Sequence, residues 1–247
     1  MPRPAPRMLE VVRSQHLTPN ILRVTLGGPG LATFPENQES AYIKLILPRE
    51  EGAPLMRTYT IATQRSREID VDFALHAARG PATDWALSAR PGDPVMIGGP
   101  GPSKLINRDA DWFLLAGDMT ALPAIRVNVA LLPRDAMGYI VLEVAAPEDV
   151  HPLGQPPGMA LHWVVNNGPD AQRGPFLDCV QQLPWLPGQA AVWAACEFSN
   201  FRALRRYFKQ ERAVDKSRLY VSSYWKQGCS EDQHKLEKSA DARASDD

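Results

Sequence analysis

Cysteine is scarce in this sequence. The 247 residues include three cysteines, Cys179, Cys196 and Cys229, which lie far apart and are odd in number. They form no C-x-x-C pair, so the spacing argues against a disulfide framework and against an iron–sulfur or zinc cluster. The chain therefore fits a reducing compartment, where structural disulfides are rare.

Long apolar runs are also missing. No run approaches the roughly 20 apolar residues that a membrane-spanning helix needs. Residues 1–13 include basic side chains but no continuous apolar stretch, so we expect no signal peptide. We therefore predict a cytoplasmic protein with no membrane span.

An excess of charge of either sign is absent as well. Lys and Arg number 27 and Asp and Glu number 28, so nothing in the net charge calls for nucleic acid as a partner. The five histidines show no i,i+4 pair or other spacing typical of metal ligands, and we expect no metal site on the protein. They are His16, His76, His151, His162 and His234.

Short strands separated by turn residues make up the first half of the chain. Hydrophobic residues are 44% of the sequence, enough for a core, and 247 residues suggest one large domain or two smaller ones. Turn signals at 18–20 and 27–30 separate β-branched runs, which predicts a small antiparallel barrel. Residues 69–75 alternate apolar with acidic side chains, so we expect a half-exposed strand there.

Apolar runs alternate with helical patterns in the second half. Residues 112–116 form a continuous apolar run, typical of a strand buried on both faces. Further predicted strands are 139–145, 161–165, 192–196 and 219–222, and the predicted helices are 121–132 and 200–212. Ser199 is the expected cap of the second helix. For the tail, we expect a short exposed helix at 230–238 and disorder after Ser239.

Together these patterns predict a β + α/β fold. A six-stranded antiparallel barrel occupies residues 1–107, and an α/β nucleotide-binding domain with a parallel sheet occupies residues 108–247. Ligands of such sheets bind beyond the carboxyl ends of the strands, here residues 117–120 and 196–199. The glycine fingerprint of the usual dinucleotide-binding domain is absent. The basic helix after Ser199 either meets the phosphates or ribose of a nicotinamide nucleotide or is a solvated charged face.

The stretch Arg57-Thr58-Tyr59-Thr60 suits a flavin nucleotide. Arg57 and Tyr59 share one face if the stretch is a strand, because side chains alternate with period two. A guanidinium can grip a diphosphate, and a phenol ring can stack on an isoalloxazine. The hydroxyls or N–H groups of Thr58 and Thr60 can bond the polar edge of the ring. The same four residues are also an ordinary strand, since Thr and Tyr favour strands.

Two further stretches are candidates for phosphate binding. Gly80-Pro81 breaks the chain before a short predicted helix that contains Thr83, and free N–H groups at a helix start bind anions. A helix start without a ligand is the alternative. Residues 98–104 match neither phosphate-loop pattern, so we interpret them as a turn that ends the barrel, from which Ser103 can reach a phosphate.

Several motifs in order resemble the siderophore-interacting proteins, a family of cytoplasmic flavin-dependent ferric-siderophore reductases within the ferredoxin-NADP reductase superfamily. The resemblance runs from about Val11 to His234. The motifs that carry it are Arg57-Thr58-Tyr59-Thr60, Asp70-Val71-Asp72-Phe73 through His76, Gly80-Pro81-Ala82 with Trp85-Ala86, Ala116-Gly117-Asp118 with Thr120-Ala121-Leu122-Pro123-Ala124-Ile125, Arg202-Ala203-Leu204-Arg205-Arg206-Tyr207, and Tyr224-Trp225-Lys226 with Ser230-Glu231-Asp232.

The resemblance implies a non-covalent FAD on the barrel and assigns its contacts. Arg57, Tyr59 and Thr60 are expected to hold the pyrophosphate and isoalloxazine. His76, Ala82 and Thr83 are expected along the pyrophosphate, with Gly80, Trp85 and Thr58 in the same motifs and Ser103 as a further contact. On the nicotinamide side the expected residues are Asp118, Thr120 and Glu197. Two positions depart from the family pattern: Met119 stands where members usually have Glu, and Cys196 where they have Gly.

The implied reaction transfers electrons from NADH, NADPH or reduced ferredoxin through FAD to a ferric siderophore. A nicotinamide gives two electrons as hydride and Fe(III) accepts one, so a flavin is a suitable intermediary. Many ferric siderophores are anionic, and basic residues near the flavin would attract them. Lys44 and Lys226 are the candidates, and each is equally readable as a solvated lysine. A non-catalytic siderophore- or flavin-binding protein and a general flavin reductase are the alternatives.

Overall fold

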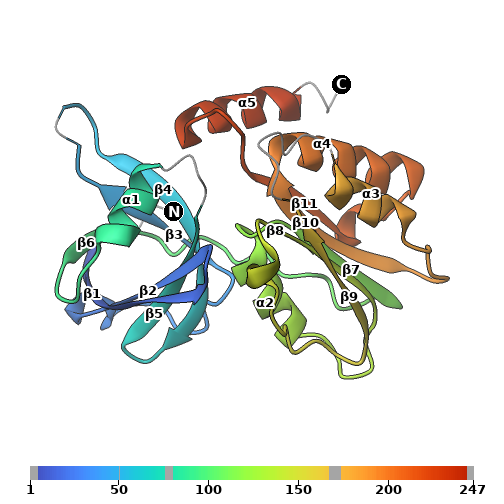
Figure 1. Ribbon diagram of the computed structural model, residues 1–247, viewed down its shortest axis with the longest axis horizontal. Coiled ribbons are helices and arrows are strands. Elements are labelled where there is room, and N and C mark those ends of the chain that lie inside the picture. Colours follow the sequence, from blue (N-terminus) through green and yellow to red (C-terminus); the bar gives the residue numbers. More distant parts are fainter. Residues whose placement is uncertain (1–4, 50, 76–79, 167–173, 244–247) are drawn as a thin grey trace. The chain divides into compact units, whose positions relative to one another are not determined.

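The chain forms two compact units in a computed structural model, which describes residues 5–49, 51–75, 80–166 and 174–243 (Figure 1). The first unit comprises Met1–Leu105 with the short segments Arg126–Asn128 and Ala146–Leu153, and the second comprises the remainder. Among the described residues, no helix combines the length and apolar character needed to cross a membrane.

A closed antiparallel barrel forms the first unit, as the sequence predicts. Its strand order is β1-β2-β5-β4-β3-β6. The strands are β1 Arg7–Thr18, β2 Ile21–Gly27, β3 Tyr42–Leu47, β4 Leu55–Arg65, β5 Glu68–Ala74 and β6 Pro94–Gly98. The 3-10 turn η1 Pro29–Leu31 lies between β2 and β3, and the helix α1 Pro81–Ser88 lies between β5 and β6. The predicted barrel is therefore confirmed, with six strands.

Alternation of side chains produces the barrel core. In β3 the residues Ile43, Leu45 and Leu47 are buried and the residues between them are half-buried. β-Branched and aromatic side chains favour such strands because they pack well on a pleated surface. α1 begins at Pro81, which tolerates the first helical position because no intrahelical partner is lost there. Ala82 and Ala86 of this helix pack against the barrel core.

One strand of the barrel is more buried than its sequence predicts. β5 was expected to be half-exposed, but Asp70 is 3% exposed. Its carboxylate accepts hydrogen bonds from Thr25 Oγ1 at 2.7 Å and from Arg65 at 2.7 and 2.8 Å. The prediction fails there because an acidic residue is tolerated inside when it is fully hydrogen-bonded and paired, and both partners come from other strands.

A parallel five-stranded sheet of order β11-β10-β7-β8-β9 forms the centre of the second unit. The strands are β7 Trp112–Gly117, β8 Met137–Val144, β9 Gly158–Val165, β10 Ala190–Glu197 and β11 Leu219–Trp225. Every residue of β7 and β10 is buried, as expected for strands covered on both faces. The predicted α/β unit with a parallel sheet is confirmed.

Helices of the second unit differ from the predicted ones at their ends. The helices are α2 Leu122–Ala130, of which residues 126–128 group with the first unit, α3 Pro175–Gln182, α4 Phe198–Arg206 and α5 Glu231–Arg243. Two short elements follow α4, the π-helix η3 Tyr207–Glu211 and the 3-10 turn η4 Lys216–Arg218, whereas the 3-10 turn η2 Pro147–Asp149 belongs to the first unit. Glu197, not Ser199, caps α4: its side chain accepts a hydrogen bond from Ser199 N. A carboxylate at this position is favoured by the positive end of the helix dipole.

The C-terminal helix α5 is longer than predicted and binds the sheet through polar side chains. It continues to Arg243, so the prediction of disorder after Ser239 is wrong for residues 240–243. His234 is 5% exposed and its Nε2 lies 2.6 Å from Ser223 Oγ, whereas Leu236 is 73% exposed. Asp241 pairs with Arg202 at 3.0 Å and with Arg205 at 2.8 Å. This polar contact surface has no apolar periodicity that a sequence pattern would detect.

Candidate functional site

The predicted flavin strand is β4, and its alternation agrees with the sequence pattern. Arg57 is paired with Leu45 and Tyr59 with Ile43, both of which are fully buried, so Arg57 and Tyr59 lie on the inner side of the strand. Thr58 and Thr60 lie on the other side, paired with Lys44 and Tyr42. The guanidinium of Arg57 donates to the Met56 carbonyl at 2.9 Å.

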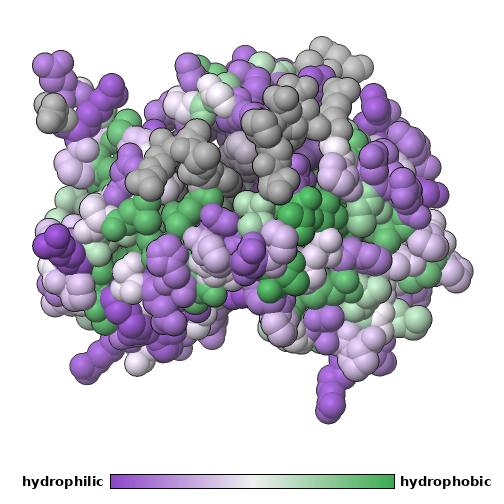
Figure 2. Space-filling view, viewed as in Figure 1, coloured by the Kyte–Doolittle hydropathy of each residue, from purple (hydrophilic) through white to green (hydrophobic). Residues whose placement is uncertain are grey.

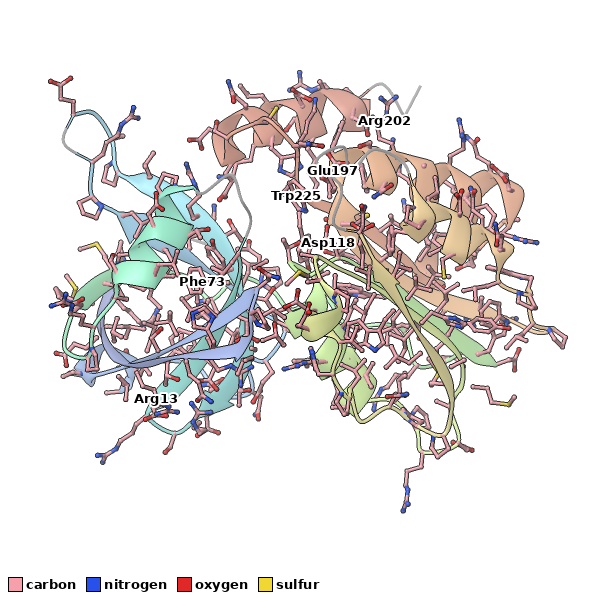
Figure 3. The ribbon with its side chains drawn as sticks, viewed as in Figure 1. Arg13, Phe73, Asp118, Glu197, Arg202 and Trp225 are labelled. Atoms are coloured by element: carbon pink, nitrogen blue, oxygen red, sulfur yellow. The ribbon has the colours of Figure 1, made fainter. Side chains whose placement is uncertain are left out.

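Aromatic rings gather beside this strand. The ring of Tyr59 lies 4.3 Å from that of Phe73, and Phe73 lies 5.9 Å from Trp85 of α1 (Figure 3 labels Phe73). In the described residues, β4 pairs with β5 only from Ile61 to Arg65, so Leu55–Thr60 lies beyond this pairing. A planar ring can therefore approach the backbone and the Tyr59 side chain at this part of the barrel.

The other predicted FAD contacts of the first unit that the structure describes lie at α1 and in the segment after β6. Gly80 precedes α1 as its N-cap, and the half-buried Thr83 lies in its first turn, so the N–H groups of this turn are suited to an anion. Ala82 is buried against the core and Ser103 is exposed. The prediction for His76 lies outside the described residues. The barrel therefore carries a guanidinium and a helix N-terminus that can bind a pyrophosphate, and an aromatic ring that can stack on an isoalloxazine. These groups fit FAD.

Asp118 is a hydrogen-bonding centre at the carboxyl edge of the second unit's sheet. It is 7% exposed and follows β7 directly. Its Oδ1 accepts from the Thr120 backbone N–H at 2.9 Å and from Thr120 Oγ1 at 2.5 Å. Its Oδ2 accepts from Glu197 N at 3.0 Å and from Trp225 Nε1 at 2.8 Å, so the predicted residues Asp118, Thr120 and Glu197 are brought together (Figure 3). Four bonds on one carboxylate connect the ends of β7, β10 and β11.

Glu143 is a residue of this edge that sequence reasoning missed. It lies near the end of β8, and its Oε2 accepts from Asn166 Nδ2 at 3.1 Å. Burial raises the pKa of Glu143 to about 7, the bond from Asn166 opposes the rise, and the neighbouring carboxylates of Asp118 and Glu197 add to it. Its position could have been predicted, because β8 is the second strand of this sheet along the chain and an acidic residue near the end of such a strand is typical of nucleotide-binding units.

The two departures from the family pattern are both buried. Met119 is 6% exposed and its sulfur accepts a hydrogen bond from Ala145 N at 3.3 Å. Cys196 is fully buried at the end of β10, and burial together with the charge of Asp118 raises the pKa of its thiol. A thiol held neutral in this way is not a nucleophile, so Cys196 acts here as a packing residue.

The candidate basic residues differ in their surroundings. Lys44 is half-buried on β3, paired with Thr58 of β4 and with Gly98 of β6. Lys226 follows β11, forms an ion pair with Glu237 of α5, and its Nζ lies 5.2 Å from the ring centre of Phe198. Arg202 and Arg205 of the predicted basic helix, for which nucleotide binding was one of two interpretations, are paired with Asp241.

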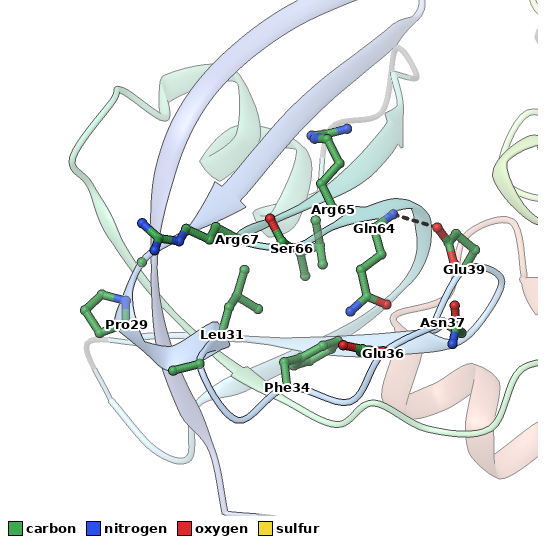
Figure 4. A pocket seen from close by; sticks show the side chains of 13 residues that line it. Pro29, Leu31, Phe34, Glu36, Asn37, Glu39, Gln64, Arg65, Ser66 and Arg67 are labelled. Carbon is green, nitrogen blue, oxygen red and sulfur yellow. Dashed lines mark hydrogen bonds between the residues drawn. The ribbon is translucent and has the colours of Figure 1, made fainter.

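The first unit also has an open cavity of about 900 Å³ between the segment after β2 and the β4–β5 hairpin (Figure 4). Its floor includes Leu31, Phe34 and Ile69, and its rim includes Glu36 and Arg67. None of the predicted site residues lines it. On the molecular face drawn in Figure 2, hydrophilic side chains are spread over each unit with smaller hydrophobic areas among them.

Comparison with known proteins shows the family of this chain. A model of the siderophore-interacting FAD-binding domain matches residues 10–55 and 48–104, and a model of the siderophore-interacting protein matches residues 110–228. The ferric vibriobactin reductase ViuB of Vibrio cholerae is 34% identical over an alignment 256 residues long, gaps included, and the alignment covers 94% of each chain. This chain belongs to the siderophore-interacting protein family.

Solved structures extend the comparison. The siderophore-interacting protein SipS from Aeromonas hydrophila is 35% identical, with a TM-score of 0.85 over 96% of this chain and 98% of the other. A ferredoxin-NADP+ reductase from Plasmodium falciparum has a TM-score of 0.67 at 13% identity, covering 89% of this chain and 96% of the other, which shows a shared fold. The family resemblance and the prediction of FAD as cofactor are confirmed.

Proposed function

We propose that this family member is an FAD-dependent ferric-siderophore reductase. It passes electrons from NADH, NADPH or reduced ferredoxin to a ferric siderophore, and releases Fe(II) in the cytoplasm. The observation that carries the proposal is the 34% identity with ferric vibriobactin reductase along nearly the whole of both chains. The flavin strand with Arg57 and Tyr59 supports it independently.

In this proposal each unit has its own ligand. Residues 1–107 bind FAD and residues 108–247 bind the nicotinamide donor. Held by the residues of the first unit, FAD would supply the redox chemistry that matches a two-electron donor to a one-electron acceptor. Arg57 binds the pyrophosphate by charge-assisted hydrogen bonds, while Tyr59 supplies a flat surface for the ring. Contacts from Thr58, Thr60, His76, Gly80, Ala82, Thr83, Trp85 and Ser103 remain part of this proposal.

The iron needs no ligand from the protein, because the siderophore already surrounds it with oxygen donors. The described residues include no group of three or more His, Cys, Asp or Glu side chains placed to hold a metal ion. The chain's part is to bind the chelate and to hold the flavin. Fe(II) is bound weakly by hard oxygen ligands, so reduction releases it.

The expected result for the purified protein is a yellow solution that NADH or NADPH bleaches in the absence of air. Adding a ferric siderophore should restore the colour and produce Fe(II), which a ferrous chelator traps. Hydroxamate and catecholate chelates, tested side by side against free flavin, distinguish a siderophore reductase from a general flavin reductase. The measurement is the anaerobic absorbance spectrum after each addition.

Other outcomes would redirect the proposal. Bleaching by reduced ferredoxin alone would identify a protein donor. A flavin that neither donor reduces would identify a non-catalytic binding protein, an alternative that the departures at Met119 and Cys196 leave open. A colourless protein that cannot take up FAD would contradict both the cofactor and the enzyme.

Lys44 is proposed to attract anionic ferric siderophores, with Lys226 as the second cation. The substitution Lys44→Ala should raise KM for an anionic ferric siderophore about five- to tenfold, because steering by charge mainly affects association. The effect should shrink at high salt, which screens exposed charges. Steady-state rates at two ionic strengths measure it, with Lys209→Ala as control. An equal change for a neutral ferric chelate would contradict the role of charge.

A further inference from the structure

The carboxyl edge of the second unit's sheet has a charge pattern that bears on the choice of electron donor. β7 and β8 are adjacent parallel strands joined through α2, the arrangement of a nucleotide-binding βαβ unit. Glu143 lies one residue before the end of the second of these strands. In dinucleotide-binding βαβ units that carry a glycine fingerprint, an acidic residue at the end of the second strand bonds the ribose hydroxyls of an adenosine. This unit lacks the fingerprint but has an acidic residue at the same position.

The surroundings of Glu143 are acidic. The charged groups that act on it among the described residues are Asp118 at the end of β7 and Glu197 at the end of β10, both of which are anionic carboxylates. The uncharged thiol of Cys196 shares the same neighbours. The neutral amide of Asn166, the residue directly after β9, donates to Glu143 from the other side. A phosphate group on the adenosine ribose would be repelled by these carboxylates, whereas a ribose hydroxyl could donate a hydrogen bond to one of them.

We infer that Glu143, aligned by Asn166, makes the enzyme select NADH against NADPH as its donor. This inference rests on the proposed function, because it presumes a nicotinamide donor. The carboxylate of Glu143 accepts a hydrogen bond from the adenosine ribose of NADH. The 2′-phosphate of NADPH replaces that donor with an anion, so binding loses a hydrogen bond and gains repulsion.

The inference has a pH signature. Because the pKa of Glu143 is raised to about 7, this carboxyl is mostly neutral at pH 6 and mostly ionised at pH 8. Discrimination against NADPH should therefore grow as the pH rises through 7. A phosphate monoester loses its second proton near pH 6, so above pH 6.5 the 2′-phosphate itself changes little.

The test uses the FAD-loaded enzyme and compares the second-order rates of anaerobic flavin reduction by NADH and NADPH at pH 6.5, 7.5 and 8.5. In the wild type we expect a preference for NADH of about tenfold at pH 8.5, shrinking toward pH 6.5. Glu143→Gln should lower the preference about tenfold and remove its pH dependence. Glu211→Gln, which removes an exposed carboxylate of η3, is the matched control and should behave as the wild type.

Glutamine matches the shape and hydrogen bonding of the protonated acid, so the variant should fold. A measurement on the wild type guards against failure of the variant: 5′-AMP should compete with NADH more strongly than 2′,5′-ADP does at pH 8. Equal rates with both nucleotides, or a preference that survives in Glu143→Gln, would overturn the inference alone. Reduction by neither nucleotide would overturn the nicotinamide donor of the proposed function and the inference with it.

Discussion

Arg57→Ala should yield a folded protein that has lost its FAD. The guanidinium is the one cation on the inner side of β4, and two charge-assisted bonds to a diphosphate contribute about 3–4 kcal/mol, equivalent to a 10²- to 10³-fold change in affinity. The barrel should survive because Arg57 is only half-buried and, among the described residues, bonds to the neighbouring Met56 carbonyl. The ratio of bound flavin to protein, from absorbance after gel filtration, measures the effect.

Arg67→Ala is the matched control for that experiment. Arg67 is an exposed arginine of the same barrel, at the rim of the cavity rather than on the flavin strand, so its removal should leave flavin content unchanged. Circular dichroism of both variants checks the fold. Full flavin content in Arg57→Ala would show that the pyrophosphate is bound elsewhere, and loss of the barrel signal would show that Arg57 has a structural role.

Asp118→Asn should destabilise the protein by about 3 kcal/mol. All four donors around Asp118 point at carboxylate oxygens, from Thr120, Glu197 and Trp225. An amide offers one oxygen in place of two, and its NH₂ group would face two of these donors, so buried N–H groups lose their acceptors. The midpoint of urea unfolding, followed by tryptophan fluorescence, measures the loss.

The control for that substitution is Asp135→Asn, which removes an exposed carboxylate of the same unit and should shift stability by less than about 0.5 kcal/mol. Since Trp225 donates directly to Asp118, Trp225→Phe should reproduce part of the loss by removing one donor. An Asp118→Asn protein as stable as the wild type would mean that these bonds do not connect the three strand ends in solution.

Local patterns in the sequence determined most of the architecture. Alternation with period two places Ile43, Leu45 and Leu47 in the barrel core, and the continuous apolar runs of β7 and β10 indicate strands covered on both faces. The face shared by Arg57 and Tyr59 follows from the same period. These features depend on neighbours in the chain, so they are readable without coordinates.

The interactions that join distant segments were decided by the tertiary structure. Asp70 is buried because Thr25 and Arg65 bond it, and Asp118 is saturated because Trp225, far along the chain, reaches it. α5 contacts the sheet through His234 and the helix α4 through Asp241, rather than through an apolar stripe. The sequence by itself determined which segments become strands and where the predicted flavin strand lies. Only the folded chain decided which polar groups share a partner, because hydrogen bonds between side chains of different elements leave no periodic trace in either segment.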